Sequence, residues 1–229
     1  MKVAFWPGLG GGTQAFAEVE DALRERGVHA FTVDPRYGSR GDWRLPVLAS
    51  ELAGTGADAF AGASWGGAVA VVAAGLRAPS ALVLIDGGHT GRRDQPAVDV
   101  RAHHETLRWS STEEFVESMR VASPRWNTVL ERAAMTNVVE RDGAIVPVFD
   151  ADTLESIIQS FDDYDPCASL AAVPRSTRML FVASRDATDE QLERLPTHAD
   201  VRVLDQPHDI VRGLGPELGA LIADWLGEA

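Results

Sequence analysis

One short segment of the sequence has the residue types and spacing of a nucleophile site. Gly62, Ser64 and Gly66 form a Gly-x-Ser-x-Gly motif between an apolar, strand-like run and a helix-like stretch. Such a junction requires a sharp turn, and glycines without Cβ atoms let the strand and the helix close around the serine. The turn would expose the Ser64 hydroxyl and aim the backbone N–H of Trp65 at an anion forming there. We therefore expect a nucleophile at Ser64 and an oxyanion-hole donor at Trp65; the alternative is a glycine-rich turn with an idle serine.

The elements that must position this serine follow a regular pattern. Six short apolar runs occur at residues 3–6, 29–34, 57–64, 81–86, 177–184 and 201–206. Helix-like stretches occur at residues 13–26, 65–77 and 216–226. Near-continuous apolar strands that alternate with helices are typical of a parallel sheet covered on both faces. We predict an α/β fold with a doubly wound, mostly parallel sheet of about six strands.

The alternation breaks after Asp86. Residues 89–165 contain no convincing buried strand but have helix-like segments at 112–121, 125–136 and 153–161. We predict that residues 1–88 and 166–229 form the core and that residues 89–165 form a helical cap inserted into it. Within the cap, Arg92 and Arg93 are expected to form a solvated turn. His89, Trp109 and Trp126 are candidates for contact with a substrate, although tryptophans are more often part of a hydrophobic core.

Composition narrows the class of protein further. The 229 residues include 34 acidic and 21 basic side chains, a net charge of -13, so nucleic acid is an unfavourable partner. Cys167 is the only cysteine, which excludes an intrachain disulfide and fits a reducing compartment such as the cytoplasm. Lys2 is the only lysine, so a Walker-A lysine is absent. No apolar run reaches the length of a membrane span, and the N-terminal apolar run is too short for a signal peptide.

With its serine motif between strand and helix, the sequence resembles the α/β-hydrolase family over nearly its whole length. In that family an acid and then a histidine follow the serine along the chain. The resemblance implies that His208, just past the sixth run, is the base and that Asp186, after the fifth run, is the acid. Asp86, which ends the fourth run, is the alternative acid, because some members place it there. The resemblance also implies that the N–H of Leu9, in the loop after the first run, is the second oxyanion donor.

The resemblance carries a reaction class with it. It implies a serine hydrolase that uses a Ser-His-Asp triad and an acyl-enzyme intermediate, with no metal, no organic cofactor and a small-molecule acyl substrate. An ester is the expected substrate, with a thioester or lactone next. The elbow is also similar to that of the proline-iminopeptidase branch, Gly-Gly-Ser-Trp-Gly, so an amidase or peptidase is an alternative. The first run starts at residue 3, so we expect the sheet to lack the antiparallel strands that open the full family sheet.

Two alternatives come from other functional classes. Gly10, Gly12 and Ala15 satisfy Gly-x-Gly-x-x-Ala after a strand, and Asp34 lies where a ribose-binding acid would lie in a dinucleotide-binding oxidoreductase. Glycine-rich turns between strand and helix are common, so this motif is the weaker one. The other alternative is a binding protein that keeps the fold and has lost the chemistry.

Overall fold

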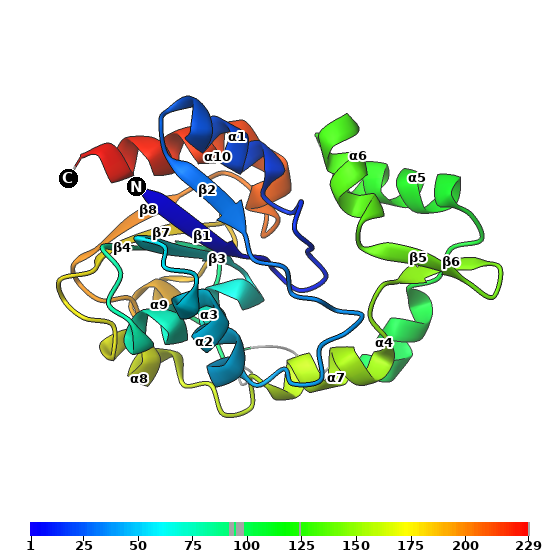
Figure 1. The fold of residues 1–229 in the computed structure, drawn as a ribbon, viewed down its shortest axis with the longest axis horizontal. Helices are drawn as coiled ribbons and strands as arrows, with labels where there is room; N and C mark the ends of the chain where they lie inside the picture. Colours follow the sequence, from blue (N-terminus) through cyan, green and yellow to red (C-terminus); the bar gives the residue numbers. More distant parts are fainter. Residues whose placement is uncertain (92–93, 95–98, 124, 229) are drawn as a thin grey trace.

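A sheet of six parallel strands carries the elements on which the predicted site depends (Figure 1). The computed structural model describes residues 1–91, 94, 99–123 and 125–228, so Arg92 and Arg93 lie outside the described residues. In order across the sheet, the strands are β2 (His29–Thr32), β1 (Lys2–Trp6), β3 (Ala59–Ala63), β4 (Ala81–Ile85), β7 (Arg178–Ala183) and β8 (Ala199–Val203). Every neighbouring pair is parallel. The predicted fold class, with its sheet of about six strands, is confirmed.

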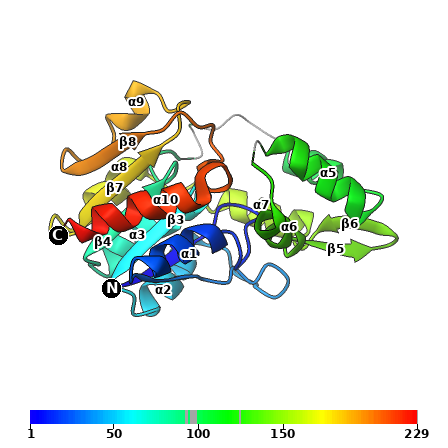
Figure 2. The same cartoon turned by 90° about the horizontal axis from the view of Figure 1, so that it is seen from above.

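Helices cover both faces of this sheet (Figures 1 and 2). Side chains alternate along a strand, so β1 sends Val3 and Phe5 to one face and Ala4 and Trp6 to the other. The first face packs against α1 (Ala17–Glu25) and α10 (Ile210–Gly227). The second face packs against α2 (Leu45–Gly54), α3 (Trp65–Leu76), α8 (Pro166–Ala171) and α9 (Asp189–Leu192). Because the sheet, α2 and α8 surround α3, its sequence is apolar on nearly all sides.

Apart from α8, which packs against a face of the sheet, the described chain between β4 and β7 lies to one side of it (Figure 1). This part of the chain contains α4 (Val100–Thr106), α5 (Thr112–Ala122), α6 (Thr128–Met135), β5 (Val138–Arg141), β6 (Ala144–Pro147) and α7 (Ala151–Gln159). The antiparallel β5–β6 hairpin is a correction, because the sequence analysis found no strand here. Its strands have only four residues each, β5 is mostly exposed, and the largely buried apolar run of β6 was not recognised as a strand. The better signal was Asp142-Gly143, since both residues have the positive φ that a two-residue hairpin turn requires.

Polar contacts tie this insertion to the core and fix its parts relative to one another. The Glu18 carboxylate on α1 accepts hydrogen bonds from Arg125 and Asn127, both at 2.9 Å. Within the insertion, the Arg101 guanidinium on α4 donates to Asp152 and Glu155 on α7, at 2.6 and 2.7 Å. Helix α7 also packs onto the core itself, because Ile157 is fully buried in the same cluster as Trp65. The insertion is therefore attached to the core in two places, next to α6 and at α7.

The described helices include none that combines the length and the apolar composition needed to cross a lipid bilayer.

Candidate active site

The turn between β3 and α3 places Ser64 in a strained backbone conformation. Ser64 has φ 49° and ψ −123°, in the positive-φ region that residues other than glycine rarely adopt. A Cβ at Gly62 would come within 2.1 Å of the Gly66 carbonyl oxygen. A Cβ at Gly66 would come within 2.3 Å of the Trp6 carbonyl oxygen. Both contacts are impossible for a real side chain, so the two glycines of the motif are required by the close approach of strand, turn and helix, as the sequence predicted.

The end of β4 packs just as closely against the serine. A Cβ at Gly87 would lie 2.0 Å from the Ser64 carbonyl oxygen. The Ser64 N–H donates to the Ile85 carbonyl oxygen at 3.0 Å, and Asp86 has a positive φ of 45°. This glycine lets the chain that follows β4 pass directly beside the serine turn. The Asp86 side chain is thereby brought to the same edge of the sheet as Ser64.

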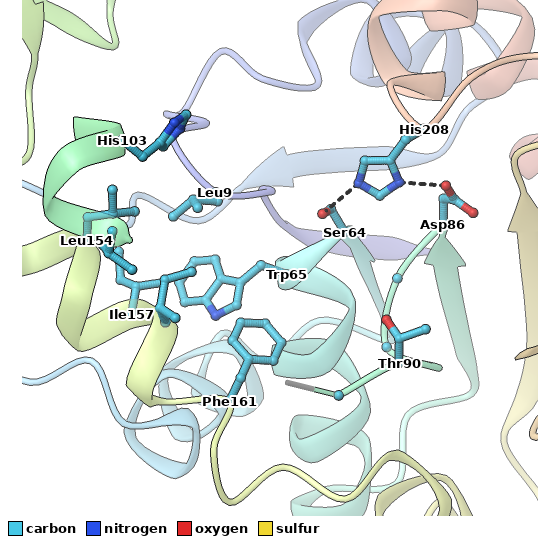
Figure 3. Close-up of a pocket in the computed structure, with 15 residues that line it drawn as sticks. Leu9, Ser64, Trp65, Asp86, Thr90, His103, Leu154, Ile157, Phe161 and His208 are labelled. Atoms are coloured by element: carbon cyan, nitrogen blue, oxygen red, sulfur yellow. Dashed lines mark hydrogen bonds and ion pairs between the residues drawn. The ribbon is translucent and has the colours of Figure 1, made fainter. Parts of the chain in front are cut away.

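A chain of hydrogen bonds joins three side chains at this edge (Figure 3). His208 Nε2 lies 2.9 Å from Ser64 Oγ, and His208 Nδ1 lies 2.6 Å from Asp86 Oδ2. The other Asp86 oxygen accepts the Ser184 N–H at 3.0 Å. A carboxylate can only accept, so Nδ1 carries the proton and Nε2 is free to accept the proton of the serine hydroxyl. This is the geometry that a serine needs to become a nucleophile.

The expected partner of the histidine was wrong: the structure pairs His208 with Asp86 and not with Asp186. Asp86 is only 6% exposed and its carboxylate is fixed by the Ser184 N–H. Asp186 is exposed and has no hydrogen bond to His208. Both acids follow strands whose carboxyl ends share one edge of the sheet, but β4 is the immediate neighbour of β3, which leads into Ser64. The positive φ of Asp86 then turns its side chain toward the histidine.

The surroundings of His208 and Asp86 shift the pKa values of both side chains. The hydrogen bond from Asp86 raises the pKa of His208, although desolvation works against the shift. Burial acts to raise the pKa of Asp86, but hydrogen bonds from His208 and Ser184 outweigh it and the pKa is lowered. Asp86 therefore stays ionised at neutral pH and stabilises an imidazolium that forms beside it.

The loop after β1 lies against the serine and brings Leu9 close to Trp65 (Figure 3). Within the described part of the chain, the backbone N–H groups of Leu9 and Trp65 have no hydrogen-bond acceptor. Gly10, the next residue, has a φ of 77°, and its N–H donates to the Tyr37 hydroxyl at 2.9 Å. Both predicted oxyanion donors are thus unengaged beside Ser64, and their role in catalysis stays a prediction.

Tyr37 is a residue that the sequence analysis did not single out. It is buried and stacks on Trp43 at a ring distance of 5.2 Å. Its other neighbour, also at 5.2 Å, is Phe149 from the insertion. Tyr37 therefore holds the Gly10 backbone while touching the insertion. No local pattern marks such a residue, because its role depends on a contact between distant parts of the chain.

A cavity of about 500 Å³ opens beside Ser64. Apart from the triad and the turn after Asp86, it is lined mainly by apolar side chains of the core and of the insertion (Figure 3). These are Leu9, Trp65, Val100, Leu154, Ile157, Ile158 and Phe161, with Thr90 and His103 as the additional polar side chains. The face of α7 was detectable from the spacing of residues 154, 157, 158 and 161, which is that of one helix face. The sequence analysis had recognised a helix there without assigning its face.

None of the three predicted substrate contacts lines this cavity. His89 is buried, with its ring edge-on to Phe181 at 4.6 Å, and desolvation lowers its pKa. Trp109 packs against Phe115 at 4.9 Å, and Trp126 belongs to the same small cluster inside the insertion. These candidates are corrected: His89 supports the start of the insertion, and the two tryptophans form its own core. Among the described residues, no group of three or more His, Cys, Asp or Glu side chains is placed to hold a metal ion.

Together, the parallel sheet, the serine turn after β3 and the histidine beyond β8 define the α/β-hydrolase fold, and solved structures with that fold match the whole chain. One is E-2-(acetamidomethylene)succinate hydrolase, with a TM-score of 0.77, 16% identity, and 99% of this chain and 92% of that chain covered. A thioesterase domain from the curacin biosynthetic pathway matches with a TM-score of 0.75 and 14% identity, and the match covers 100% of this chain and 91% of that domain. A putative hydrolase from Rickettsia typhi matches with a TM-score of 0.76 and 13% identity, and the match covers 100% of this chain and 87% of that chain. No protein-family model and no curated protein matches the chain. At these identities the likeness shows the fold, which is the one that the sequence resemblance implied.

Proposed function

We propose that this protein is a serine hydrolase that cleaves a carboxylic ester through an acyl-enzyme intermediate. The observation that carries the proposal is the hydrogen-bond chain from Ser64 through His208 to Asp86, with lengths of 2.9 and 2.6 Å. Two features support it further: the backbone strain at Ser64 and the cavity that opens directly onto its hydroxyl. A non-catalytic binding protein needs a cavity but has no need for the hydrogen-bond chain or for the strained serine.

The first half of the reaction transfers the acyl group to the enzyme. His208 Nε2 removes the hydroxyl proton while Ser64 Oγ forms a bond to the carbonyl carbon of the ester. The carbonyl oxygen becomes an oxyanion, which the N–H groups of Trp65 and Leu9 stabilise; the loss of one such donor typically costs about 10²–10³ in turnover. The bond to the alcohol then breaks, and the alcohol oxygen takes the proton from His208. Ser64 is left as an acyl ester.

The second half regenerates the enzyme by the same groups. His208 Nε2 takes a proton from a water molecule, whose oxygen attacks the acyl carbonyl carbon. The tetrahedral intermediate collapses, Ser64 Oγ leaves and recovers a proton from the imidazolium, and a carboxylic acid is released. Throughout, Asp86 keeps the proton on Nδ1 and balances the positive charge of the ring.

An ester is the preferred substrate, with a thioester or a lactone next, because their oxygen or sulfur leaving groups are expelled more readily than the nitrogen of an amide. An amide of the proline-iminopeptidase type remains the alternative within this fold. We also retain the cytoplasm as the site of action, because the only cysteine, Cys167, is exposed and free.

Labelling with a fluorophosphonate probe tests the proposal. The wild-type protein should take up one phosphonyl group per chain on the peptide that contains Ser64, and it should hydrolyse p-nitrophenyl esters. Ser64→Ala should fold normally, judged by circular dichroism and thermal unfolding, but should neither label nor turn over substrate. Full ester hydrolysis by Ser64→Ala, or a folded wild-type protein that never labels, would contradict the proposal, and the latter result would favour a binding protein.

A further inference from the structure

Two cavities meet at Ser64. The first is the one of about 500 Å³ under α7, here called the α7 cavity. The second, of about 280 Å³, lies between α6 and the start of α10 and is here called the α6 cavity. Leu9, Ser64 and His208 line both. The residues that would carry out the chemistry therefore stand at the junction, and a carbonyl carbon bound to Ser64 would have one space on each side.

The described lining of the α7 cavity is poor in groups that could pair with a charge, and Thr90 and His103 are its polar side chains outside the triad. No lysine or arginine is among its described lining residues. The carboxylate at its edge, Asp86, is already committed to His208 and Ser184. Its depth is formed by aliphatic and aromatic side chains, including the buried Leu154 and Ile157. An anionic group placed in this depth would lose its hydration with no lysine or arginine among the described lining residues to pair with, in a protein whose net charge is already -13.

The α6 cavity has a different lining. Apolar side chains such as Phe16, Leu130 and Val211 line it too, but three polar side chains, Asn137, Asp209 and Arg212, are added to the shared residues. Asp209 and Arg212 belong to the segment that directly follows His208, and they form an ion pair of 3.2 Å whose side chains are 54% and 42% exposed. This cavity is therefore bordered by hydrated groups next to the imidazole.

The reaction places different demands on the two parts of an ester. The acyl group is covalently attached to Ser64 while the acyl-enzyme waits for water, so it does not have to leave in the first half of the reaction and can occupy an apolar space closed by a packed helix. The leaving group must receive a proton from His208, depart, and make way for water. The α6 cavity suits that requirement, because the solvated side chains of Asp209 and Arg212 line it beside the base.

Resting on the function proposed above, we infer that the α7 cavity takes an uncharged, apolar acyl group and that the α6 cavity takes the alcohol part of the ester. Two lining residues outside the catalytic machinery test this division, Ile158 on α7 and Ala133 on α6. Both are half-buried, so each accepts a larger side chain at a helix surface.

The experiment compares Ile158→Trp with Ala133→Trp on two series of esters. One series has acetyl, butanoyl, hexanoyl, octanoyl and decanoyl groups on one alcohol; the other has a hexanoyl group on methyl, butyl, benzyl and naphthyl alcohols. Ile158→Trp should move the optimum of kcat/KM to shorter acyl groups and leave the order of the alcohols unchanged. Ala133→Trp should keep the acyl optimum and selectively lower kcat/KM for the bulky alcohols. A further pair compares a hexanoyl ester with the ester of the same length that ends in a carboxylate, which should be hydrolysed about a hundredfold more slowly by the wild type.

An aliquot of each variant is first titrated with the fluorophosphonate, so that the rates of the untreated enzyme are expressed per active site. If a tryptophan prevents folding, Val100→Phe replaces the α7 variant and Val211→Phe replaces the α6 variant. The division is overturned if the two variants exchange effects, if both alter the same series, or if the terminal carboxylate is accepted equally well. A wild-type protein that labels at Ser64 keeps the proposed function in each of these cases, whereas one that never labels removes both.

Discussion

The carboxyl ends of β3 and β4 and the insertion between β4 and β7 are built in opposite ways. At the strand ends, three backbone segments approach so closely that a Cβ at Gly62, Gly66 or Gly87 would lie within 2.3 Å of a carbonyl oxygen. In the part of the insertion that does not pack onto the core, the side chains form a small cluster around Phe115 and Ile145, and short helices present much of their surface to solvent. The first region has no freedom to change, while the second can vary its side chains without disturbing the triad. Under the proposed function, the strand ends would determine the reaction and the insertion would determine what is bound.

The largest expected effect comes from adding one methyl group where the strand ends leave no space. Gly87→Ala would place a Cβ 2.0 Å from the Ser64 carbonyl oxygen, so the serine turn or the start of the insertion must move. We expect the free energy of unfolding to fall by more than about 3 kcal/mol and fluorophosphonate labelling to disappear. Urea unfolding and labelling measure the two effects. Gly38→Ala is the control, because a Cβ there meets nothing within 4 Å; equal stability of the two variants would refute the packing argument.

The next effect separates the two candidate acids. Asp86→Asn should lower kcat/KM by up to about 10⁴, because an amide in place of the carboxylate leaves the imidazole in the wrong tautomer. Asp186→Asn should keep kcat/KM close to the wild-type value, because Asp186 does not contact the ring. Steady-state kinetics on one ester measures both. An inactive Asp186→Asn with an active Asp86→Asn would restore the acid that the sequence favoured and contradict the geometry.

A smaller effect is expected where the two regions touch. Tyr37→Phe removes the acceptor of the Gly10 N–H, so the loop that carries Leu9 loses its fixed position. An unsatisfied buried donor costs about 1–3 kcal/mol, and we expect kcat to fall about tenfold with KM unchanged. The matched control is Tyr164→Phe, since the hydroxyl of this buried tyrosine donates to the Gly88 carbonyl oxygen at 2.6 Å instead. Tyr164→Phe should lower the melting temperature but leave kcat intact; a similar loss of kcat in both would mean that Tyr37 has only a structural role.

The smallest effect is a displacement of the pH profile. His208 must be neutral to accept the serine proton, so kcat/KM should fall as the pH drops through the pKa of this histidine in the free enzyme. Because the hydrogen bond from Asp86 raises this pKa, the midpoint should lie above the ordinary histidine value of about 6.5. The residual activity of Asp86→Asn should have its midpoint at lower pH. A midpoint that is the same in both proteins would show that Asp86 does not set the pKa of His208.

Much of the core was predictable because its signals are local. The strands around β3 appear as apolar runs, and the glycines around Ser64 report a turn that allows no side chain there. His208 was identified from the order of serine, acid and histidine along the chains of the α/β-hydrolase family, and the structure places its Nε2 within hydrogen-bond distance of Ser64 Oγ. These features do not depend on knowing where distant segments lie.

The remaining features depend on long-range geometry. Asp86 and Asp186 each follow an apolar strand, and only the positions of the strands in the sheet and the positive φ of Asp86 distinguish them. Trp109 and Trp126 would have the same sequence pattern whether they lined a cavity or packed in a core. Their packing against the small cluster inside the insertion could therefore not be predicted from the sequence. Tyr37 is another such residue, because its partners Gly10 and Phe149 come from the loop after β1 and from the insertion.

The position of His208 in the chain has a consequence for how the protein is made. It is separated from Asp86 by 122 residues and from Ser64 by 144, and the helix that follows it, α10, packs against α1. A ribosome that adds about 5–20 residues per second completes Asp86 roughly 6 to 24 s before it reaches this histidine. Throughout that interval the nascent chain holds a serine with no base to activate it. The hydrolase chemistry would therefore switch on only when α10 docks, so a growing chain cannot be acylated by its own substrate before synthesis has reached that helix.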